Sequence, residues 1–229
     1  MLKIISLGGG VINPNKINTE YIRDFRNLIF KWIREDDRRK IILITGGGKT
    51  AREYQKSYKQ LNPTFENSDL DGIGIMATKL NADFICKSMR PFCLDPVVSD
   101  PSKDFSFRGN ILVASGWKPG FSTDYVTVKF AEKFRSNEII NLTNVNQVYD
   151  KDPKKFDDAR GLNNITWDKL QDIVGKNWAP GSNLPFDPIA TRLALKLNLK
   201  AYVLNGLDIK NLEKVFNKNN DFLGTIIVK

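Results

Sequence analysis

Two runs of three glycines are the feature of this chain best suited to chemistry. Residues 8–10 follow the apolar stretch 2–7, and residues 46–48 follow the apolar stretch 40–45. Glycines let the backbone approach a phosphate closely and turn several amides toward it. Arg52 would lie one turn into the helix after the second run, where its guanidinium could form bidentate hydrogen bonds to a phosphate. The spacing is neither a GxxxxGK[ST] loop nor GxGxxG, so tight strand-to-helix turns remain an alternative interpretation.

A third candidate loop, residues 118–124 (KPGFSTD), follows the apolar stretch 111–114. Ser122, Thr123 and Asp124 are residue types that cap helix N-termini. Capping explains one of them, but not the Pro-Gly turn that precedes them. The loop is therefore predicted to bind a ligand.

The chain contains no histidine, and its cysteines are Cys86 and Cys93. The first fact excludes a Ser-His-Asp triad, a Cys-His pair and any His-ligated metal site. The cysteines are seven residues apart without a CxxC motif, so neither a disulfide framework nor a zinc site is expected. Any chemistry must use Lys, Arg, Asp, Glu, hydroxyl groups and backbone amides.

A positive net charge suits three kinds of partner, one of them a small phosphorylated molecule. The chain has 35 Lys and Arg against 26 Asp and Glu, a net charge of +9, which also suits nucleic acid or an acidic surface. The positive charges are spread out, however, and the densest run, 34–40 (REDDRRK), mixes signs. No segment approaches the roughly 20 apolar residues that span a bilayer. We expect a cytoplasmic protein that binds neither nucleic acid nor membrane.

Short apolar runs alternate with longer amphipathic stretches, which positions the three loops. Strands are predicted at 2–7, 40–45, 111–114, 138–142, 201–204 and 225–228, and helices at 19–34, 49–61, 69–89, 124–134, 167–174, 186–197 and 209–216. This alternation predicts an α/β fold with a mainly parallel sheet covered on both faces. Ligands bind such sheets at the carboxyl ends of strands, where all three loops would lie.

Three details of these elements are further expectations. In the helix over 69–89, Ile73, Met76, Leu80, Phe84 and Ile85 are predicted to face inward. Lys3 is predicted to be a solvated lysine at a strand start, on the face opposite Ser6. The polar stretch 151–164 is predicted to be a surface excursion, and residues 181–183 a surface turn or a lid.

Five blocks of the sequence resemble the amino acid kinase superfamily, and within it the uridylate (UMP) kinases of the archaeal type. They are GGGKTAREY at 46–54, DGIGIMATKLNA at 71–82, PGFSTD at 119–124, TNVNQVYDKDP at 143–153 and FDPIA at 186–190, in the expected order. The resemblance implies a three-layer αβα sandwich forming a single domain over 1–229. Its acceptor part would cover roughly 1–135 and its ATP part roughly 136–229.

The resemblance also implies an activity and its partners: ATP-dependent phosphorylation of UMP to UDP in pyrimidine nucleotide biosynthesis. Mg²⁺ would accompany ATP, with no metal held by the protein alone, and the chain would form a homo-oligomer, a hexamer built from dimers. UMP offers an already anionic phosphate oxygen as the nucleophile. Phosphoryl transfer then depends on positioning and charge cancellation, which suits a chain without histidine.

The resemblance assigns the following residues. The catalytic ones are Gly9, Gly10 and Arg52; the UMP-binding ones are Gly47, Asp71, Pro119, Gly120, Phe121, Ser122, Thr123 and Asp124; the ATP-binding ones are Gly9, Gly10, Gly48, Arg52, Thr143, Asn144, Tyr149 and Asp152.

The sequence departs from the family pattern at a few positions. Ser6 stands where many members carry a lysine that neutralises the transferred phosphoryl group, and Asn146-Gln147 replaces an Asp-Gly pair. Two alternatives therefore stay open. One is a kinase of the same fold with another small acceptor, such as a carbamate, a carboxylate or another phosphate. The other is a nucleotide-binding or storage protein with little turnover.

Overall fold

A seven-stranded sheet forms the centre of the molecule. The computed structural model describes residues 1–177 and 184–229. The strands lie in the order β3 (Ile111–Ala114), β2 (Lys40–Thr45), β1 (Leu2–Leu7), β4 (Glu138–Thr143), β8 (Lys200–Asn205), β9 (Thr225–Val228) and β7 (Asn164–Thr166). The five strands from β3 to β8 are parallel, whereas β9 runs antiparallel to β8. This is the mainly parallel sheet that the alternation of elements predicted.

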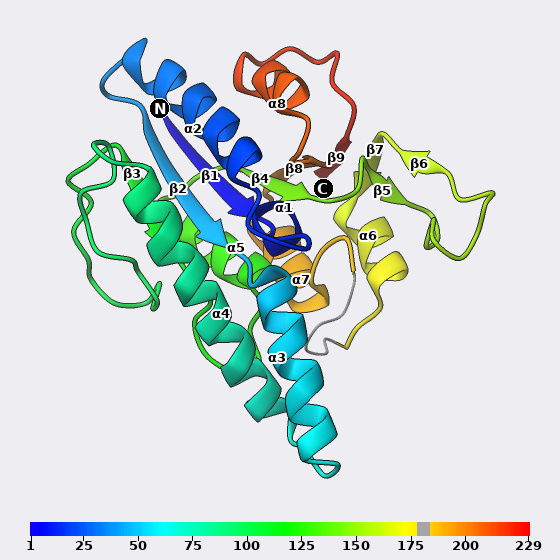
Figure 1. The fold of residues 1–229 in the computed structure, drawn as a ribbon. Coiled ribbons are helices and arrows are strands. Elements are labelled where there is room, and N and C mark those ends of the chain that lie inside the picture. Colours follow the sequence, from blue (N-terminus) through cyan, green and yellow to red (C-terminus); the bar gives the residue numbers. More distant parts are fainter. Residues whose placement is uncertain (178–183) are drawn as a thin grey trace.

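Helices cover both faces of the sheet and make three layers (Figure 1). One face packs on α2 (Thr19–Arg34), α8 (Ile209–Phe216) and the end of α4 (Asn67–Ser88), and the other on α5 (Thr123–Lys133), α6 (Trp167–Val174) and α7 (Pro188–Lys196). Strands buried on both sides have continuous apolar sequences, as the run KIILIT of β2 does. The predicted αβα sandwich is confirmed.

Side-chain caps set where several helices begin. The side chains of Asn18, Ser122, Asp187 and Asp208 accept a backbone N–H in the first turn of α2, α5, α7 and α8. Capping satisfies amides that would otherwise lack a partner. Two of these caps, at α5 and α7, hold helix N-termini beside the carboxyl ends of the strands.

Helix α4 corrects one prediction of side-chain orientation. Ile85 is buried, but Met76, Leu80 and Phe84 are 63%, 63% and 38% exposed. The reason is architectural: α3 (Gly48–Leu61) and α4 form a hairpin that extends beyond the sheet, so much of α4 has no layer to pack against (Figure 1). Helical periodicity finds an apolar stripe but does not say what covers it.

Lys3 corrects a second prediction. It lies on the face opposite Ser6, as expected, but it is only 3% exposed. Its Nζ lies 4.8 Å from the centroid of the Phe216 ring and 5.6 Å from that of Trp32. Burial lowers the pKa of this amine, and the two aromatic faces partly offset the cost of burying its charge.

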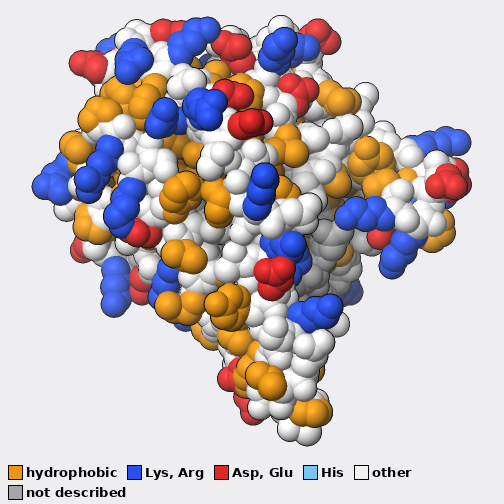
Figure 2. Space-filling model, in the orientation of Figure 1, with side chains coloured by type: hydrophobic (Ala, Val, Ile, Leu, Met, Phe, Trp, Pro, Cys, Tyr) orange, Lys and Arg blue, Asp and Glu red, His pale blue; other side chains and the backbone are white. Residues whose placement is uncertain are grey.

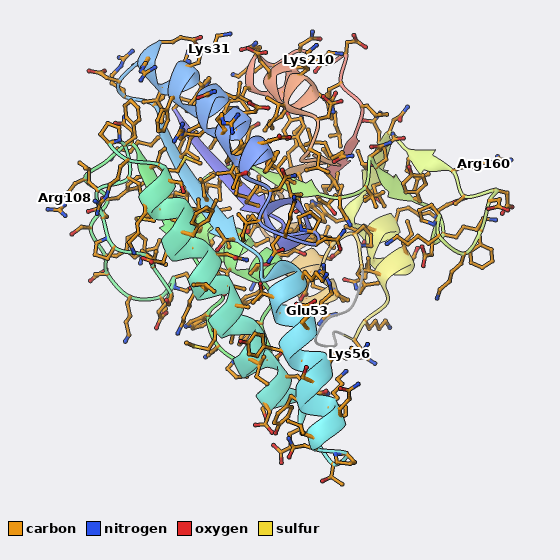
Figure 3. The ribbon with its side chains drawn as sticks, viewed as in Figure 1. Lys31, Glu53, Lys56, Arg108, Arg160 and Lys210 are labelled. Carbon is orange, nitrogen blue, oxygen red and sulfur yellow. The ribbon has the colours of Figure 1, made fainter. Side chains whose placement is uncertain are left out.

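Small elements near the loops are absent from the sequence prediction. Helix α1 (Gly9–Ile12) begins inside the first glycine run. Strand β5 (Val148–Tyr149), just before the polar excursion, pairs antiparallel with β6 (Gly161–Leu162) inside it to form a hairpin. Figure 3 shows Arg160 projecting from this hairpin away from the sheet. Residues 181–183, predicted to be a turn or a lid, lie outside the described residues. In the described ranges, no helix has the length and hydropathy needed to cross a membrane.

Candidate active site

The two glycine loops pack backbone against backbone at the ends of β1 and β2. A Cβ atom on Gly9 would lie 2.0 Å from the amide nitrogen of Gly48, and one on Gly46 would lie 2.4 Å from that of Gly9. Gly48 has a φ of +66°, and the Lys49 N–H donates to the Asn13 carbonyl at 2.9 Å. A side chain at Gly9, Gly46 or Gly48 would therefore force the loops apart.

Gly10 differs from these three glycines. A Cβ atom there would meet only the Asn144 side chain, at 3.6 Å, an ordinary contact. Gly10 also lines the cavity described below. Gly9, Gly46 and Gly48 are thus required for the two loops to pack together, whereas the absence of a side chain at Gly10 leaves room in the cavity.

Helix α4 holds in place both the second glycine loop and the segment 116–124, which contains the third candidate loop. The Asn81 amide donates to the carbonyls of Gly46 and Gly47 at 2.7 and 3.2 Å. One turn earlier, the Thr78 hydroxyl accepts the Gly116 N–H at 2.8 Å. Near the start of the helix, Asp71 accepts the Gly120 N–H at 2.8 Å. Burial raises the pKa of Asp71, and the Gly120 hydrogen bond opposes that shift.

Three aromatic rings form a row at the third candidate loop (residues 118–124). The ring centroids of Trp117 and Phe121 are 5.2 Å apart, and those of Phe121 and Tyr125 are 4.4 Å apart. The Lys118 Nζ lies 4.2 Å from the centroid of the Trp117 ring. Phe121 lines the cavity. The row holds that ring in place, where an aromatic face or edge could contact a base.

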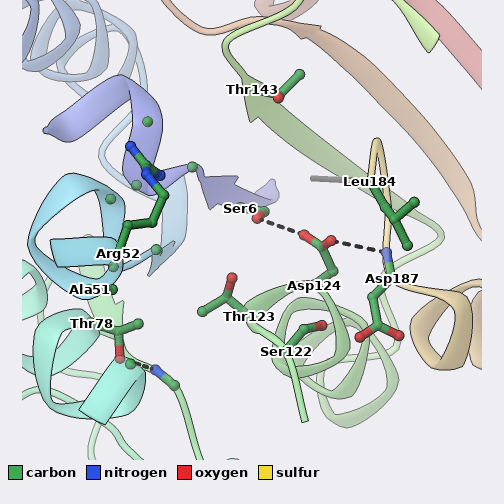
Figure 4. Close-up of a pocket in the computed structure, with 18 of the residues that line it drawn as sticks. Ser6, Ala51, Arg52, Thr78, Ser122, Thr123, Asp124, Thr143, Leu184 and Asp187 are labelled. Atoms are coloured by element: carbon green, nitrogen blue, oxygen red, sulfur yellow. Dashed lines mark hydrogen bonds between the residues drawn. The ribbon is translucent and has the colours of Figure 1, made fainter. Parts of the chain in front are cut away.

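Ser6, Asp124 and Asp187 form a polar group at the end of β1 (Figure 4). The Ser6 hydroxyl donates to one oxygen of Asp124 at 3.3 Å, and the Asp187 N–H donates to the other at 3.2 Å. Burial, followed by repulsion from Asp187, raises the pKa of Asp124 to about 7. Asp187 is itself 3% exposed and caps α7, and among residues 1–177 and 184–229 its Oδ2 has no hydrogen-bond partner. This side of the site contains carboxylates instead of an ammonium group.

The end of β4 and the polar excursion form the remaining wall. Asn141, Thr143 and Asn144 reach the cavity from β4 and the loop after it, and Lys154 reaches it from the excursion. Tyr149 and Asp152 do not line it. Tyr149 belongs to β5, and Asp152 accepts the Lys154 N–H at 3.0 Å, which shapes the turn that presents Lys154.

All these groups surround one open cavity of about 580 Å³. The predicted site residues on its wall are Gly9, Gly10, Gly47, Gly48, Arg52, Asp71, Phe121, Ser122, Thr123, Asp124, Thr143 and Asn144. Pro119, Gly120 and Asp152 lie in the neighbouring loops and Tyr149 lies in β5, and all four are off the wall. Figure 4 shows Arg52 reaching in from α3, across the cavity from Ser6 and Asp124. Among the described residues, Arg52 and Lys154 are the cationic side chains on the wall.

Comparison with known proteins agrees with this geometry. Residues 1–205 match the model of the amino acid kinase family. The chain belongs to that family. It is 29% identical over 230 residues to a uridylate kinase of Methanobrevibacter smithii, covering 99% of each chain. It is 32% identical over 216 residues to one of Sulfolobus acidocaldarius, covering 92% of each chain.

Solved structures give the same result. A uridylate kinase from Archaeoglobus fulgidus superposes with a TM-score of 0.81 at 30% identity, covering 99% of this chain and 100% of the other. A UMP kinase from Bacillus anthracis has a TM-score of 0.76 at 20% identity, and at that identity the likeness concerns the fold alone.

Asn146 and Gln147, the departures from the family pattern, form contacts inside this kinase fold. Asn146 accepts from the Asn205 amide at 3.0 Å. Gln147 donates to the Gly224 carbonyl at 3.1 Å, and neither side chain lines the cavity. The Gln147 side chain therefore connects the loop after β4 to Gly224, the residue that precedes β9.

Sequence reasoning missed several residues on the wall, among them Gln55, Thr78, Asn141, Lys154 and Asp187. Asp187 lies in the FDPIA block and is a helix cap by residue type, so that signal was available. Lys154 had no signal of this kind, because nothing in a polar run indicates which lysine folds back toward a distant sheet.

Proposed function

We propose that this chain is a uridylate kinase, a nucleoside monophosphate kinase that transfers the γ-phosphoryl group of ATP to UMP and yields UDP and ADP. One observation carries the proposal: two glycine loops, each able to bind phosphate, meet in backbone contact on a single cavity that Arg52 enters. The archaeal relatives named uridylate kinase, matched over nearly the whole chain, support the choice of acceptor.

The residues suit a transfer that depends on positioning. The UMP phosphate is an anionic nucleophile, so no side chain needs to remove a proton. Asp71 and the loop of Phe121, Ser122 and Thr123 would hold the uridine side, with Gly47 near the acceptor phosphate. Gly9, Gly10 and Gly48 would offer amides to the ATP phosphates, with Thr143 and Asn144 beside them. Fixed donors in a partly closed site stabilise the charge that develops during transfer.

Two cations would do the work of the lysine that is missing at Ser6. Arg52 presents a planar fork that can bridge phosphate oxygens, and Lys154 lines the cavity from the polar excursion. Asp124 and Asp187 add negative charge next to Ser6. The phosphoryl group would therefore be neutralised mainly from the Arg52 and Lys154 sides of the cavity.

Mg²⁺ fits the residues present. No group of three or more His, Cys, Asp or Glu side chains in residues 1–177 and 184–229 could hold a metal ion alone. Mg²⁺ carried by nucleotide phosphates needs only one or two carboxylates. Asp124 faces the cavity, and a buried oxygen of Asp187 has no partner within the described part of the chain. The ion would neutralise phosphate charge; Asp124 would be its ligand from this chain.

The division of labour follows the fold. We propose that residues up to about 135 supply most of the acceptor side and the later ones most of the ATP side, with Tyr149 and Asp152 in the loops that flank ATP. Such a kinase works where ATP and UMP are available, and the proposed location is the cytoplasm.

The test is release of ADP from ATP and Mg²⁺ with each nucleoside monophosphate in turn. UMP should be preferred over CMP, AMP and GMP, because a site built to hydrogen-bond one base leaves polar groups unpaired with another. Turnover with carbamate or a simple carboxylate but not UMP would favour the other small-acceptor kinase. ATP binding by calorimetry without turnover of any acceptor would favour a storage protein.

We further propose that the chain forms a homo-oligomer, a hexamer built from dimers, through α4. Met76, Leu80 and Phe84 are spaced four residues apart, so they share one face of the helix. Hydrophobic side chains lie along the surface over α4 (Figure 2). An exposed apolar face of a helix is typical of an interface between copies.

A further inference from the structure

The two cysteines lie against each other at the end of α4. Cys86 is in the last turn of the helix. Cys93 lies in the segment between α4 and β3 and forms an isolated parallel bridge with Ile111, the first residue of β3. Their Sγ atoms are 2.9 Å apart. The chain has no other cysteine, so neither thiol has an alternative partner within the chain.

The backbone around both thiols is held by hydrogen bonds. The Cys93 N–H donates to the Met89 carbonyl at 3.2 Å, and the Ile111 N–H donates to the Phe92 carbonyl at 3.0 Å. Further along, the buried carboxylate of Asp95 accepts from Arg108, which Figure 3 shows at the outer edge of this loop. The proximity of the thiols is therefore imposed by surrounding structure and not by a free loop.

The two thiols differ in access. Cys93 is 2% exposed, whereas Cys86 is partly exposed. An oxidant from solvent would therefore meet Cys86 first, with Cys93 directly behind it. A partly exposed thiol backed by a second thiol is the arrangement of a cysteine with a resolving partner.

We propose that Cys86 and Cys93 form a reversible intramolecular disulfide when the protein meets a peroxide. The Cys86 sulfur attacks the O–O bond and becomes a sulfenic acid, and one water leaves. The Cys93 sulfur then attacks the Cys86 sulfur, its proton joins the departing hydroxide as a second water, and the S–S bond forms. Two thiols are oxidised by two electrons while one peroxide is reduced to two waters.

The disulfide would tie the end of α4 to the segment that leads into β3. Asn81, which holds the carbonyls of the second glycine loop, lies little more than one turn before Cys86. The bond would close a short loop and restrict the unfolded chain, so the thermal midpoint should rise by roughly 4–8 °C. This inference does not depend on the proposed kinase activity.

The experiment treats reduced, desalted protein with hydrogen peroxide and counts thiols after unfolding in guanidinium. The count should fall from two to none, the intact mass should drop by two hydrogen atoms, and dithiothreitol should reverse both. Trypsin without reduction should release the peptide 80–87 linked to the peptide 88–103, since cleavage after Lys87 separates the cysteines.

Cys86→Ser is the matched control, because the partly exposed position tolerates a hydroxyl. Its thermal midpoint should not rise with peroxide, and the linked peptide should be absent. Two titratable thiols after treatment would overturn the proposal. So would a sulfinic acid on Cys86 beside an unmodified Cys93, or a disulfide found only between two chains on a non-reducing gel.

Discussion

Arg52 enters the cavity from the first turns of α3 and has no ion-pair partner among the described residues. Arg52→Ala should lower kcat/KM for both nucleotides by about 2–4 kcal/mol, or roughly 30- to 1000-fold, because a fork to phosphate is lost. Lys49→Ala is the matched control: Lys49 pairs with Glu53 at 3.4 Å and lies off the cavity wall. Steady-state kinetics with both variants, at unchanged thermal midpoints, would measure the difference. Equal activity of the two would mean that Arg52 is a solvated helix residue.

Lys154 is the cation that the sequence did not single out. Lys154→Ala should reduce kcat about tenfold, or about 1.4 kcal/mol, because it removes positive charge from the side of the transferred group. Lys155→Ala changes the adjacent lysine, which does not line the cavity, and should leave kcat unchanged. The ratio of kcat for Lys154→Ala to kcat for Lys155→Ala distinguishes a direct contact with phosphate from the effect of the loop's net charge.

Asp71, which we propose binds the acceptor, also makes stability depend on pH. Burial raises its pKa, so ionisation is less favourable in the folded chain than in the unfolded one. Its contribution to stability is present at low pH and lost as pH rises through the range where the carboxyl ionises. Asp71→Asn should therefore have a thermal midpoint at pH 7 equal to or above that of the original protein, with the advantage vanishing below pH ~4.

The same variant should bind UMP more weakly, and its KM for UMP should rise while that for ATP stays the same. Thermal melts across pH and initial-rate kinetics check the two halves separately. A midpoint that falls at pH 7 would show that the Gly120 hydrogen bond outweighs the cost of burying the charge.

At the level of elements, the glycine loops allow packing to be separated from phosphate binding. Gly9→Ala should destabilise the fold by about 3 kcal/mol or more, because the new methyl group overlaps the Gly48 backbone. Gly10→Ala should keep its thermal midpoint, since its methyl group meets only Asn144 at an ordinary distance, yet should weaken ATP binding. Calorimetry of ATP binding and a melt of each variant give the comparison. If the Gly10→Ala protein is active and binds ATP with normal affinity, the glycines form turns and do not bind phosphate.

Most elements could be predicted from the sequence. A continuous apolar run such as 40–45 indicates a buried strand, and the amphipathic pattern of 19–34 indicates a helix. The errors have two physical origins. Met76 and Lys3 were misplaced because periodicity locates a face of an element but not the layer opposite it. The hairpin of β5 and β6 was missed because two-residue strands carry no pattern.

The candidate site divides in the same way. Gly10 and Arg52 could be found because they belong to glycine blocks that follow strands and open helices, whereas Asp71 was assigned by resemblance to the family. Lys154 and Asn141 could not, because their place on the wall depends on which distant segments meet. The resemblance assigned Tyr149 and Asp152 to the ATP side, but neither side chain lines the cavity. The turn at Asp152 places Lys154 on the wall.

For the whole molecule, the exposed apolar face of α4 is the basis of the proposed homo-oligomer. Leu80→Lys should disrupt association of copies, because a charge would have to be buried at the interface. Light scattering after size exclusion should report a smaller species, with the far-UV spectrum unchanged. Lys79→Glu alters a neighbouring position of the helix outside the stripe and should leave the mass unchanged. A mass unaffected by Leu80→Lys would remove α4 as the interface.

The backbone contact between the two glycine loops has a consequence for inhibition. Both loops open onto the same cavity, so the two nucleotides would lie end to end with nothing between their phosphates. A single compound that joins uridine to adenosine through a chain of phosphates would fill both halves at once. Because the second half would bind intramolecularly, its affinity would exceed that of either nucleotide by as much as roughly 10²–10⁴-fold. It would compete with both substrates, and the optimal number of phosphates would measure how far apart the two nucleosides lie.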